Sequence, residues 1–88
     1  MTVEFRSSFA RDLKTIREAD LRDRIQAVIQ GVEQAGIMKD IPNLIKLKGG
    51  GNYYRIRVGD YRIGLIITGN IASFVRCLDR SEIYKGFP

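Results

Sequence analysis

Arginine side chains gather in the second half of the chain at positions where they could share one ligand. Arg55 and Arg57 stand two residues apart, and Arg62 follows shortly after them. Guanidinium groups offer forked hydrogen-bond donors that match phosphate oxygens, and they keep their charge at physiological pH. The three residues therefore predict an anion site, with phosphate as the natural ligand.

The link between Arg57 and Arg62 decides how these side chains face one another. A tight two-residue turn at Gly59-Asp60 would set Arg57 opposite Arg62. By the same register Arg55 would face Gly64, which indicates either a bulge or the close approach of a backbone or a base. Like charges directly opposite are unfavourable unless an anion or solvent compensates them. A solvated polar strand face is the alternative to an anion site.

A second pair of side chains near the C-terminus could join this site. Arg80 and Tyr84 lie four residues apart in DRSEIYK, so one helical turn would stack them. A hairpin sheet would return this segment to the first hairpin and bring Tyr84 near Arg57 and Arg62. A tyrosine at the rim of the core is an equally good interpretation of Tyr84.

The composition is that of one ordinary globular domain, residues 1–88, because a chain of 88 residues is too short for two cores. Cys77 is alone and histidine is absent, so we expect no disulfide, no transition-metal site and no cofactor. No apolar run is long enough to span a membrane, and the N-terminus does not have the pattern of a signal peptide. We therefore expect a cytoplasmic protein without a membrane partner.

The formal net charge of +5 comes entirely from the second half of the chain. Residues 1–45 contain seven basic and seven acidic residues, whereas residues 46–88 contain eight basic and three acidic ones. Such a cationic surface attracts nucleic acid or an acidic protein. The candidate RNA-binding residues are Lys46, Lys48, Arg55, Arg57 and Lys85.

The elements that must position these residues begin with two helices. After an extended start at Thr2–Phe5, Ser7 or Ser8 could cap a helix whose apolar residues share one face. Asp20 could cap a second helix that ends at Gly36. The short connection makes them an antiparallel hairpin, and residues 37–51 are expected to form a connector. The apolar helix positions are Phe9, Leu13, Ile16, Leu21, Ile25, Val28, Ile29 and Val32.

From Asn52 onward the apolar period becomes two, which predicts three antiparallel strands at roughly 52–58, 61–68 and 71–78. Gly59-Asp60 and Gly69-Asn70 are the turns between them. The fold class is therefore α+β, with the helical hairpin packed on one face of a small antiparallel sheet whose other face is open. The residues expected to face the helices are Tyr54, Ile56, Val58, Ile63, Leu65, Ile67, Ala72 and Phe74.

The segments LKGGGNYYRIRVGDYRIGLII and FVRCLDRSEIYKGF resemble the RelE/ParE toxin superfamily, and the resemblance extends over the full length. It implies a RelE-like fold and a toxin of a type II toxin–antitoxin system. It also implies a metal-independent, ribosome-dependent endoribonuclease that cleaves mRNA and inhibits translation. By position, the catalytic residues would be Arg55, Arg57, Arg62, Arg80 and Tyr84.

The expected chemistry is attack of the RNA 2′-hydroxyl on the adjacent phosphorus. Arg57 and Arg62 would hold the scissile phosphate, and Arg80 would stabilise the phosphorane or the leaving group. Tyr84 would stack on a base or share in proton transfer. Ribosome-dependent relatives have lysine at the positions of Arg55 and Arg57, so the general base stays open. Asp79, which precedes Arg80, either orients that arginine or is a surface acid.

The resemblance also implies a cognate antitoxin, with DNA contacted only indirectly through the antitoxin complex. An acidic antitoxin segment would suit the basic sheet face, and Leu44, Ile45 and Phe87 either join that contact or pack in the core. The alternative function is that of a ParE-like toxin, which binds DNA gyrase and is not an enzyme.

Overall fold

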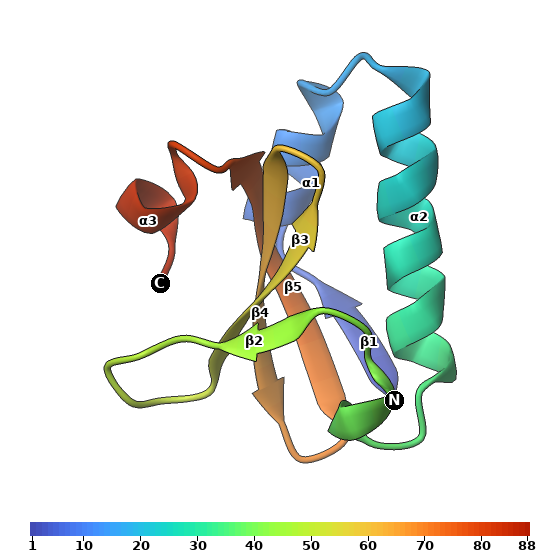
Figure 1. Ribbon diagram of the computed structural model, residues 1–88, viewed down its shortest axis with the longest axis vertical. Coiled ribbons are helices and arrows are strands. Elements are labelled where there is room, and N and C mark those ends of the chain that lie inside the picture. Colours follow the sequence, from blue (N-terminus) through green and yellow to red (C-terminus); the bar gives the residue numbers. More distant parts are fainter.

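Two helices cover one face of a five-stranded sheet in the computed structural model, which describes residues 1–88 (Figure 1). The strands lie in the order β1-β5-β4-β3-β2. The α+β class predicted from the sequence is confirmed. None of the helices combines the length and apolar character needed to cross a membrane. The elements are β1 (Thr2–Phe5), α1 (Ser7–Lys14), α2 (Ala19–Gln34), the 3-10 helix η1 (Met38–Asp40), β2 (Leu44–Lys46), β3 (Tyr53–Val58), β4 (Tyr61–Thr68), β5 (Ile71–Asp79) and α3 (Ile83–Gly86).

The centre of the sheet is the antiparallel meander β3-β4-β5, as predicted. Its first turn sets Arg57 opposite Arg62 and Arg55 opposite Gly64, which confirms the expected register. Gly59 and Gly69 open the two turns with φ of 59° and 58°, a backbone conformation that glycine adopts without steric cost. The turn chemistry therefore fixes which side chains share a face.

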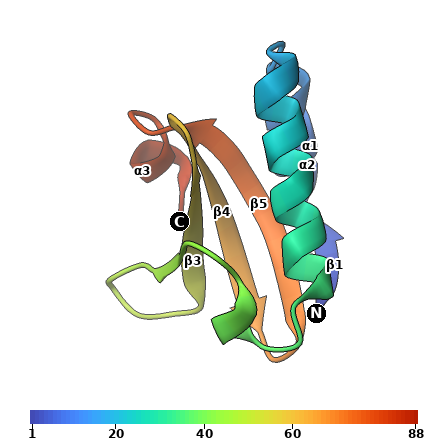
Figure 2. The same cartoon turned by 45° about the vertical axis from the view of Figure 1, so that its right-hand side comes forward.

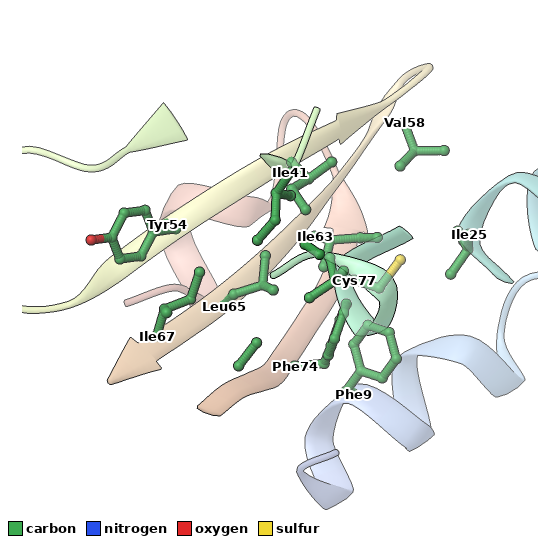
Figure 3. Packing of buried hydrophobic residues seen from close by; sticks show 14 of the residues in the cluster. Phe9, Ile25, Ile41, Tyr54, Val58, Ile63, Leu65, Ile67, Phe74 and Cys77 are labelled. Carbon is green, nitrogen blue, oxygen red and sulfur yellow. The ribbon is translucent and has the colours of Figure 1, made fainter. Parts of the chain in front are cut away.

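The core lies between the meander and the two long helices. All eight strand residues expected to face the helices are buried in one cluster with residues of α1 and α2 (Figure 3). Phe9 of α1 contacts Phe74 of β5, with 5.3 Å between the ring centroids. Removal of this apolar surface from water is the main force that holds the helical layer on the sheet.

The helix starts differ from the prediction, because the serine and aspartate side chains do not cap them. The cap positions are Arg6 and Glu18, and neither makes a side-chain cap bond. Ser8 instead donates its hydroxyl to the carbonyl of Val75, at 2.5 Å. Asp20 lies in the first turn of α2, and that helix ends at Gln34 rather than at Gly36.

Helix α1 takes the place of a strand along part of the β5 edge. Strand β1 pairs in parallel with β5 only from Thr2↔Ile71 to Phe5↔Phe74. Beyond Phe74, the Ser8 hydroxyl binds Val75 O, and a carboxylate oxygen of Asp12 accepts the amide of Cys77 at 2.8 Å. Side chains of α1 thus satisfy backbone groups that would otherwise form an open edge.

The expected connector contains a short strand, which the sequence pattern did not reveal. Strand β2 pairs antiparallel with β3, from Leu44↔Ile56 to Lys46↔Tyr54. Three residues are too few to show a period of two, and one of them, Ile45, is exposed. The following loop contains Gly49, Gly50 and Gly51, all with positive φ.

The sheet face opposite α1 and α2, here called the outer face, is partly covered, so the prediction of a wholly open face is wrong. Helix α3 lies on that side of the sheet, across from the two long helices (Figure 2). Ile83 and Phe87 are 0% and 2% exposed, although neither belongs to the main core cluster. The C-terminal segment, residues 83–88, therefore has its own small apolar contact with the outer face, and packing rather than exposure is the role of Phe87.

Candidate nucleic-acid interface

The outer face carries arginines that have no carboxylate partner. Arg55, Arg57 and Arg62 share this face because each lies directly across from, or two residues away from, another of the set. The ion pairs of the chain are Arg76 with Asp12 and Lys85 with Glu82. The guanidinium groups of Arg55, Arg57, Arg62 and Arg80 are therefore not neutralised by internal ion pairs.

Arg62 is held by the turn that precedes it. Its Nη1 donates to the carbonyl oxygens of Gly59 and Tyr61, at 2.9 and 3.0 Å. These two bonds fix the guanidinium at the β3–β4 turn, and no protein group accepts from its other nitrogens. A half-buried arginine held in this way can present its remaining donors to an anion at little entropic cost.

Arg80 lies beside the same turn, as predicted from the return of the third strand to the first hairpin. Its backbone amide donates to the carbonyl of Asp60 at 2.7 Å, and its side chain is exposed. The prediction that one helical turn stacks Arg80 on Tyr84 is wrong, because α3 begins only at Ile83. The backbone of Arg80 thus lies at the turn end of the sheet that also carries Arg57 and Arg62.

Asp79 shapes the turn after β5 and does not pair with Arg80. Its Oδ1 accepts the backbone amide of Ser81 at 2.9 Å and the Ser81 hydroxyl at 2.8 Å. The two hydrogen bonds from Ser81, with smaller help from the charges of Arg80 and Arg62, lower the pKa of Asp79 below its ordinary value. Asp79 therefore orients the backbone that carries Arg80 and delays the start of α3.

Tyr84 lies beside Arg55, not beside Arg57 and Arg62 as the sequence suggested. Tyr84 is 62% exposed and lines a hollow of about 420 Å3 on the outer face. We call this the Tyr84 hollow. Its other lining residues are Ile45, Lys46, Leu47, Lys48, Arg55 and Pro88. The site thus combines an aromatic ring, apolar walls and three cations, and two of its lysines come from the strand and loop that the sequence analysis treated as connector.

Arg57 lines a different hollow, of about 570 Å3, at the β3–β4 turn. This hollow is rich in acidic residues, including Glu18, Asp20, Asp60 and Asp79. The five predicted catalytic residues therefore do not share one hollow. Arg55 and Tyr84 form one group, whereas Arg57, Arg62 and Arg80 form another at the turn end of the same sheet.

Among the predicted RNA-binding residues, Lys85 alone has an ion-pair partner. It lies on α3 with its side chain 76% exposed, and its Nζ is 3.9 Å from a carboxylate oxygen of Glu82. The pair is at the surface, where such contacts are weak and screened by salt. The pair therefore leaves Lys85 available to another anion.

Gly64 marks a bulge, which is one of the two interpretations considered for it, and it also permits a close approach by another group. The register with β5 shifts between Gly64 and Leu65, which is a bulge. A Cβ atom at Gly64 would lie 2.7 Å from Cγ of Phe87, so the ring sits directly on the glycine. Phe87 also meets the edge of Tyr53, with ring centroids 5.5 Å apart. The group that approaches closely is thus a side chain from the C-terminus rather than a backbone or a base.

Asp12 and Arg76 were not recognised from the sequence as parts of this region. Arg76 Nε and Nη2 donate to the two carboxylate oxygens of Asp12, at 2.8 and 3.1 Å. The partners are 64 residues apart, so no local motif indicates them. No group of three or more Cys, Asp or Glu side chains is placed to hold a metal ion.

The helical layer, the five-stranded sheet and the basic outer face define a RelE-like α+β protein. Residues 3–84 match the family described as ParE toxin of type II toxin–antitoxin system, parDE. The chain belongs to this family of toxins, within the RelE/ParE superfamily, which confirms the resemblance found in the sequence.

Individual relatives agree with this assignment. The chain is 40% identical to Toxin RelE3 of Methanocaldococcus jannaschii over 89 residues, which is 100% of both chains. It is also similar to a chain in the crystal structure of the RelB-RelE antitoxin-toxin complex from Methanococcus jannaschii, with 38% identity, a TM-score of 0.81 and coverage of 97% and 99%. The archaeal RelE-RelB complex from Pyrococcus horikoshii OT3 gives a TM-score of 0.73 at 20% identity, covers 93% of this chain and 97% of that one, and supports the fold alone.

Proposed function

We propose that this toxin is an endoribonuclease that cleaves messenger RNA on the ribosome and so inhibits translation in the cytoplasm. The observation that carries the proposal is the outer face itself. Three arginines, Arg55, Arg57 and Arg62, stand there without carboxylate partners, and an exposed tyrosine lies over a cationic hollow at one end. Such a surface suits a phosphodiester and an unstacked base.

The proposed reaction uses the RNA as its own nucleophile. The 2′-oxygen forms a bond to the adjacent phosphorus while the bond from phosphorus to the 5′-oxygen breaks, which leaves a 2′,3′-cyclic phosphate and a 5′-hydroxyl. The proton of the 2′-hydroxyl passes to a base, and the leaving 5′-oxygen receives a proton. The protein must align the attack and stabilise negative charge on the phosphoryl oxygens.

The positions of the side chains suggest how the roles divide. Tyr84 would stack on a base in its hollow, where Arg55 is placed to bind the neighbouring phosphate. Arg57 and Arg62 would hold phosphate at the other end of the face, and Arg80 would stabilise the developing charge. Lys46 and Lys48 would bind the RNA backbone beside the hollow.

A cognate antitoxin is the second proposed partner. The related RelE of Methanococcus jannaschii was crystallised together with RelB. An acidic segment of an antitoxin would match the unpaired arginines of the outer face and would compete with RNA for them. We expect DNA to be contacted only through such a complex.

The test is cleavage of ribosome-bound messenger, with the new 5′ ends mapped by primer extension. We expect Tyr84→Ala and Arg55→Ala each to slow cleavage by about a hundredfold, because the first removes the ring that stacks on a base and the second removes the guanidinium that binds phosphate. Arg17→Ala is the matched control, because Arg17 is exposed in the connection between α1 and α2. Cleavage by both site variants at the wild-type rate would contradict the assignment.

Inhibition of DNA gyrase is the competing function, and it is favoured by one finding: the matching family is described as ParE toxin. The outer face would then bind a protein rather than RNA. A supercoiling assay run beside the primer extension separates the two. Arrested supercoiling without cleaved messenger would establish the gyrase inhibitor.

A further inference from the structure

Arg76 differs from the other arginines of the outer face. Residues Arg55, Gly64 and Arg76 form one row across β3, β4 and β5. Arg55 has no ion-pair partner, whereas both carboxylate oxygens of Asp12 bind the guanidinium of Arg76. The neighbouring charge of Asp12 makes Arg76 a poor phosphate ligand, so its place in this row needs another explanation.

The Asp12 end of this contact is rigid. Asp12 belongs to α1 and has a side chain that is 11% exposed, and its carboxylate also accepts the backbone amide of Cys77 at 2.8 Å. Three hydrogen bonds therefore hold it against β5. The guanidinium plane of Arg76 is fixed in turn, because a two-pronged contact of this kind sets orientation as well as distance.

The opposite edge of the same guanidinium touches the C-terminal segment. Arg76 Nη1 donates to the carbonyl of Gly86 in a long bond of 3.5 Å. A Cβ atom at Gly86 would lie 2.9 Å from that nitrogen and 3.1 Å from Cδ1 of Leu78, so the backbone of α3 rests directly on both side chains. Next to this contact, Phe87 rests on Gly64, the centre of the row.

These contacts decide where Tyr84 lies. Its own ring is exposed, and α3 has only four residues, so neither the ring nor the helix can hold itself in place. The segment is held by buried Ile83, by Phe87 on Gly64 and by Gly86 on Arg76. Tyr84 stands between the first and the last of these anchors.

We propose that Arg76 is a positioning residue, which Asp12 orients and which holds the C-terminal segment so that Tyr84 remains over the hollow beside Arg55. The role of Tyr84 rests on the proposed ribonuclease function. The anchoring of residues 83–88 does not, and it can be measured without RNA.

Two substitutions should weaken the contact between Arg76 and Gly86, one from each side. Arg76→Lys keeps a positive charge beside Asp12 but lacks the second arm that reaches Gly86. Gly86→Ala leaves the Asp12–Arg76 ion pair intact and pushes the backbone away from it. Gly31→Ala is the matched control, because a Cβ atom there meets nothing within 4 Å.

Amide hydrogen exchange tests the anchoring. We expect exchange at residues 83–87 to become about tenfold faster in Arg76→Lys and in Gly86→Ala, as loss of one hydrogen bond and its close packing implies. Exchange in β4 and α2 should stay at the wild-type rate, and Gly31→Ala should resemble wild type at residues 83–87. Unchanged exchange at residues 83–87 in both anchor variants would overturn the proposal.

A double-mutant cycle on RNA cleavage tests whether Arg76 affects the reaction through Tyr84. If Arg76 acts by placing that ring, Arg76→Lys should lower kcat by about tenfold in the wild-type chain and have no further effect in Tyr84→Ala. A full tenfold loss in both backgrounds would show a role that does not pass through Tyr84 and would overturn this step. Absence of cleavage by the wild-type chain would overturn the ribonuclease function, while the exchange result would still decide the anchoring.

Discussion

Identical side chains on the outer face have different partners, and the partners decide what each side chain can do. Arg76 is neutralised by Asp12, and hydrogen bonding to that carboxylate raises its pKa further. Arg57 stands opposite Arg62 without a carboxylate partner, and two backbone carbonyls hold Arg62 in place. The unpaired arginines are available to a phosphate, whereas the paired one serves the protein itself.

The two hydrogen bonds from Ser81 to Asp79 can be tested by removing one of them. The backbone amide of Ser81 is the largest cause of its lowered pKa, and the Ser81 hydroxyl is the second. Ser81→Ala should therefore raise the pKa of Asp79 towards its ordinary value without restoring it fully, because the backbone bond remains. A carbon-detected NMR titration of the Asp79 carboxyl measures this change.

The sign of the pH dependence follows from the direction of that shift. A lowered folded-state pKa means that the turn is stabilised above the ordinary pKa of aspartate and loses this contribution as the pH falls through the lowered value. Asp60→Asn, a change on the neighbouring turn, serves as the control. A wild-type pKa of Asp79 in Ser81→Ala would show that the hydroxyl bond contributes nothing.

At the scale of elements, α1 both covers the core and closes an edge. Its Phe9 packs on Phe74, while Ser8 and Asp12 bind backbone groups of β5 where β1 has already ended. A helix can replace a strand here because its side chains reach the carbonyl and amide that a strand would have paired. The same Asp12 connects this edge to the C-terminal segment through Arg76.

Asp12 should therefore matter more to stability than an ordinary surface carboxylate. Asp12→Ala leaves the amide of Cys77 and the guanidinium of Arg76 without their acceptor, and we expect it to lower the free energy of unfolding by about 2–4 kcal/mol. Urea denaturation at neutral pH measures this loss. Asp23→Ala, on the exposed side of α2, should change the free energy of unfolding by less than about 0.5 kcal/mol. Equal effects of the two substitutions would contradict the role of Asp12.

Elements with a regular pattern could be predicted from the sequence, and elements without one could not. The alternation from Tyr54 to Phe74 and the glycine turns predicted three strands, and the turn at Gly59-Asp60 predicted the register of the first two. The register shift between β4 and β5 at Gly64 was not predicted. Strand β2 has too few residues to show a period, and the parallel partner of β1 depends on contacts far along the chain. The covered outer face was missed because Phe87 finds its place only through the bulge at Gly64.

For the whole molecule, the important property is where the charge lies. The excess of +5 comes from residues 46–88, and the fold places Arg55, Arg57 and Arg62 on the outer face without ion-pair partners. The sequence predicted this shared face correctly, because register alone determines it. The predicted position of Tyr84 near Arg57 and Arg62 was wrong. The neighbours of Tyr84 depend on how the C-terminal segment packs on the sheet rather than on spacing along the chain.

The surface charge predicts how RNA binding responds to salt. A 2′-O-methyl RNA oligonucleotide binds without being cleaved, because it lacks the attacking hydroxyl. Its affinity should fall with salt, and Arg57→Ala should reduce the slope of log affinity against log salt by about 0.7, the value for one phosphate contact on a single strand. Fluorescence anisotropy across a salt series measures the slope. Arg17→Ala should leave it unchanged, and an unchanged slope in Arg57→Ala would remove Arg57 from the RNA-binding surface.

The parallel pairing of β1 with β5 affects the order in which a nascent chain can fold. The first strand to be synthesised finds its partner only when residues 71–74 have appeared, and Asp12 must wait 64 residues for Arg76. The ring of Phe87, which covers Gly64, is synthesised after both of these partners. Because synthesis proceeds from the N-terminus, β1 and α1 are made long before the β5 residues that they bind. The contacts along the β5 edge and the contact of Phe87 with Gly64 therefore form late, after the two helices that cover the core have been synthesised.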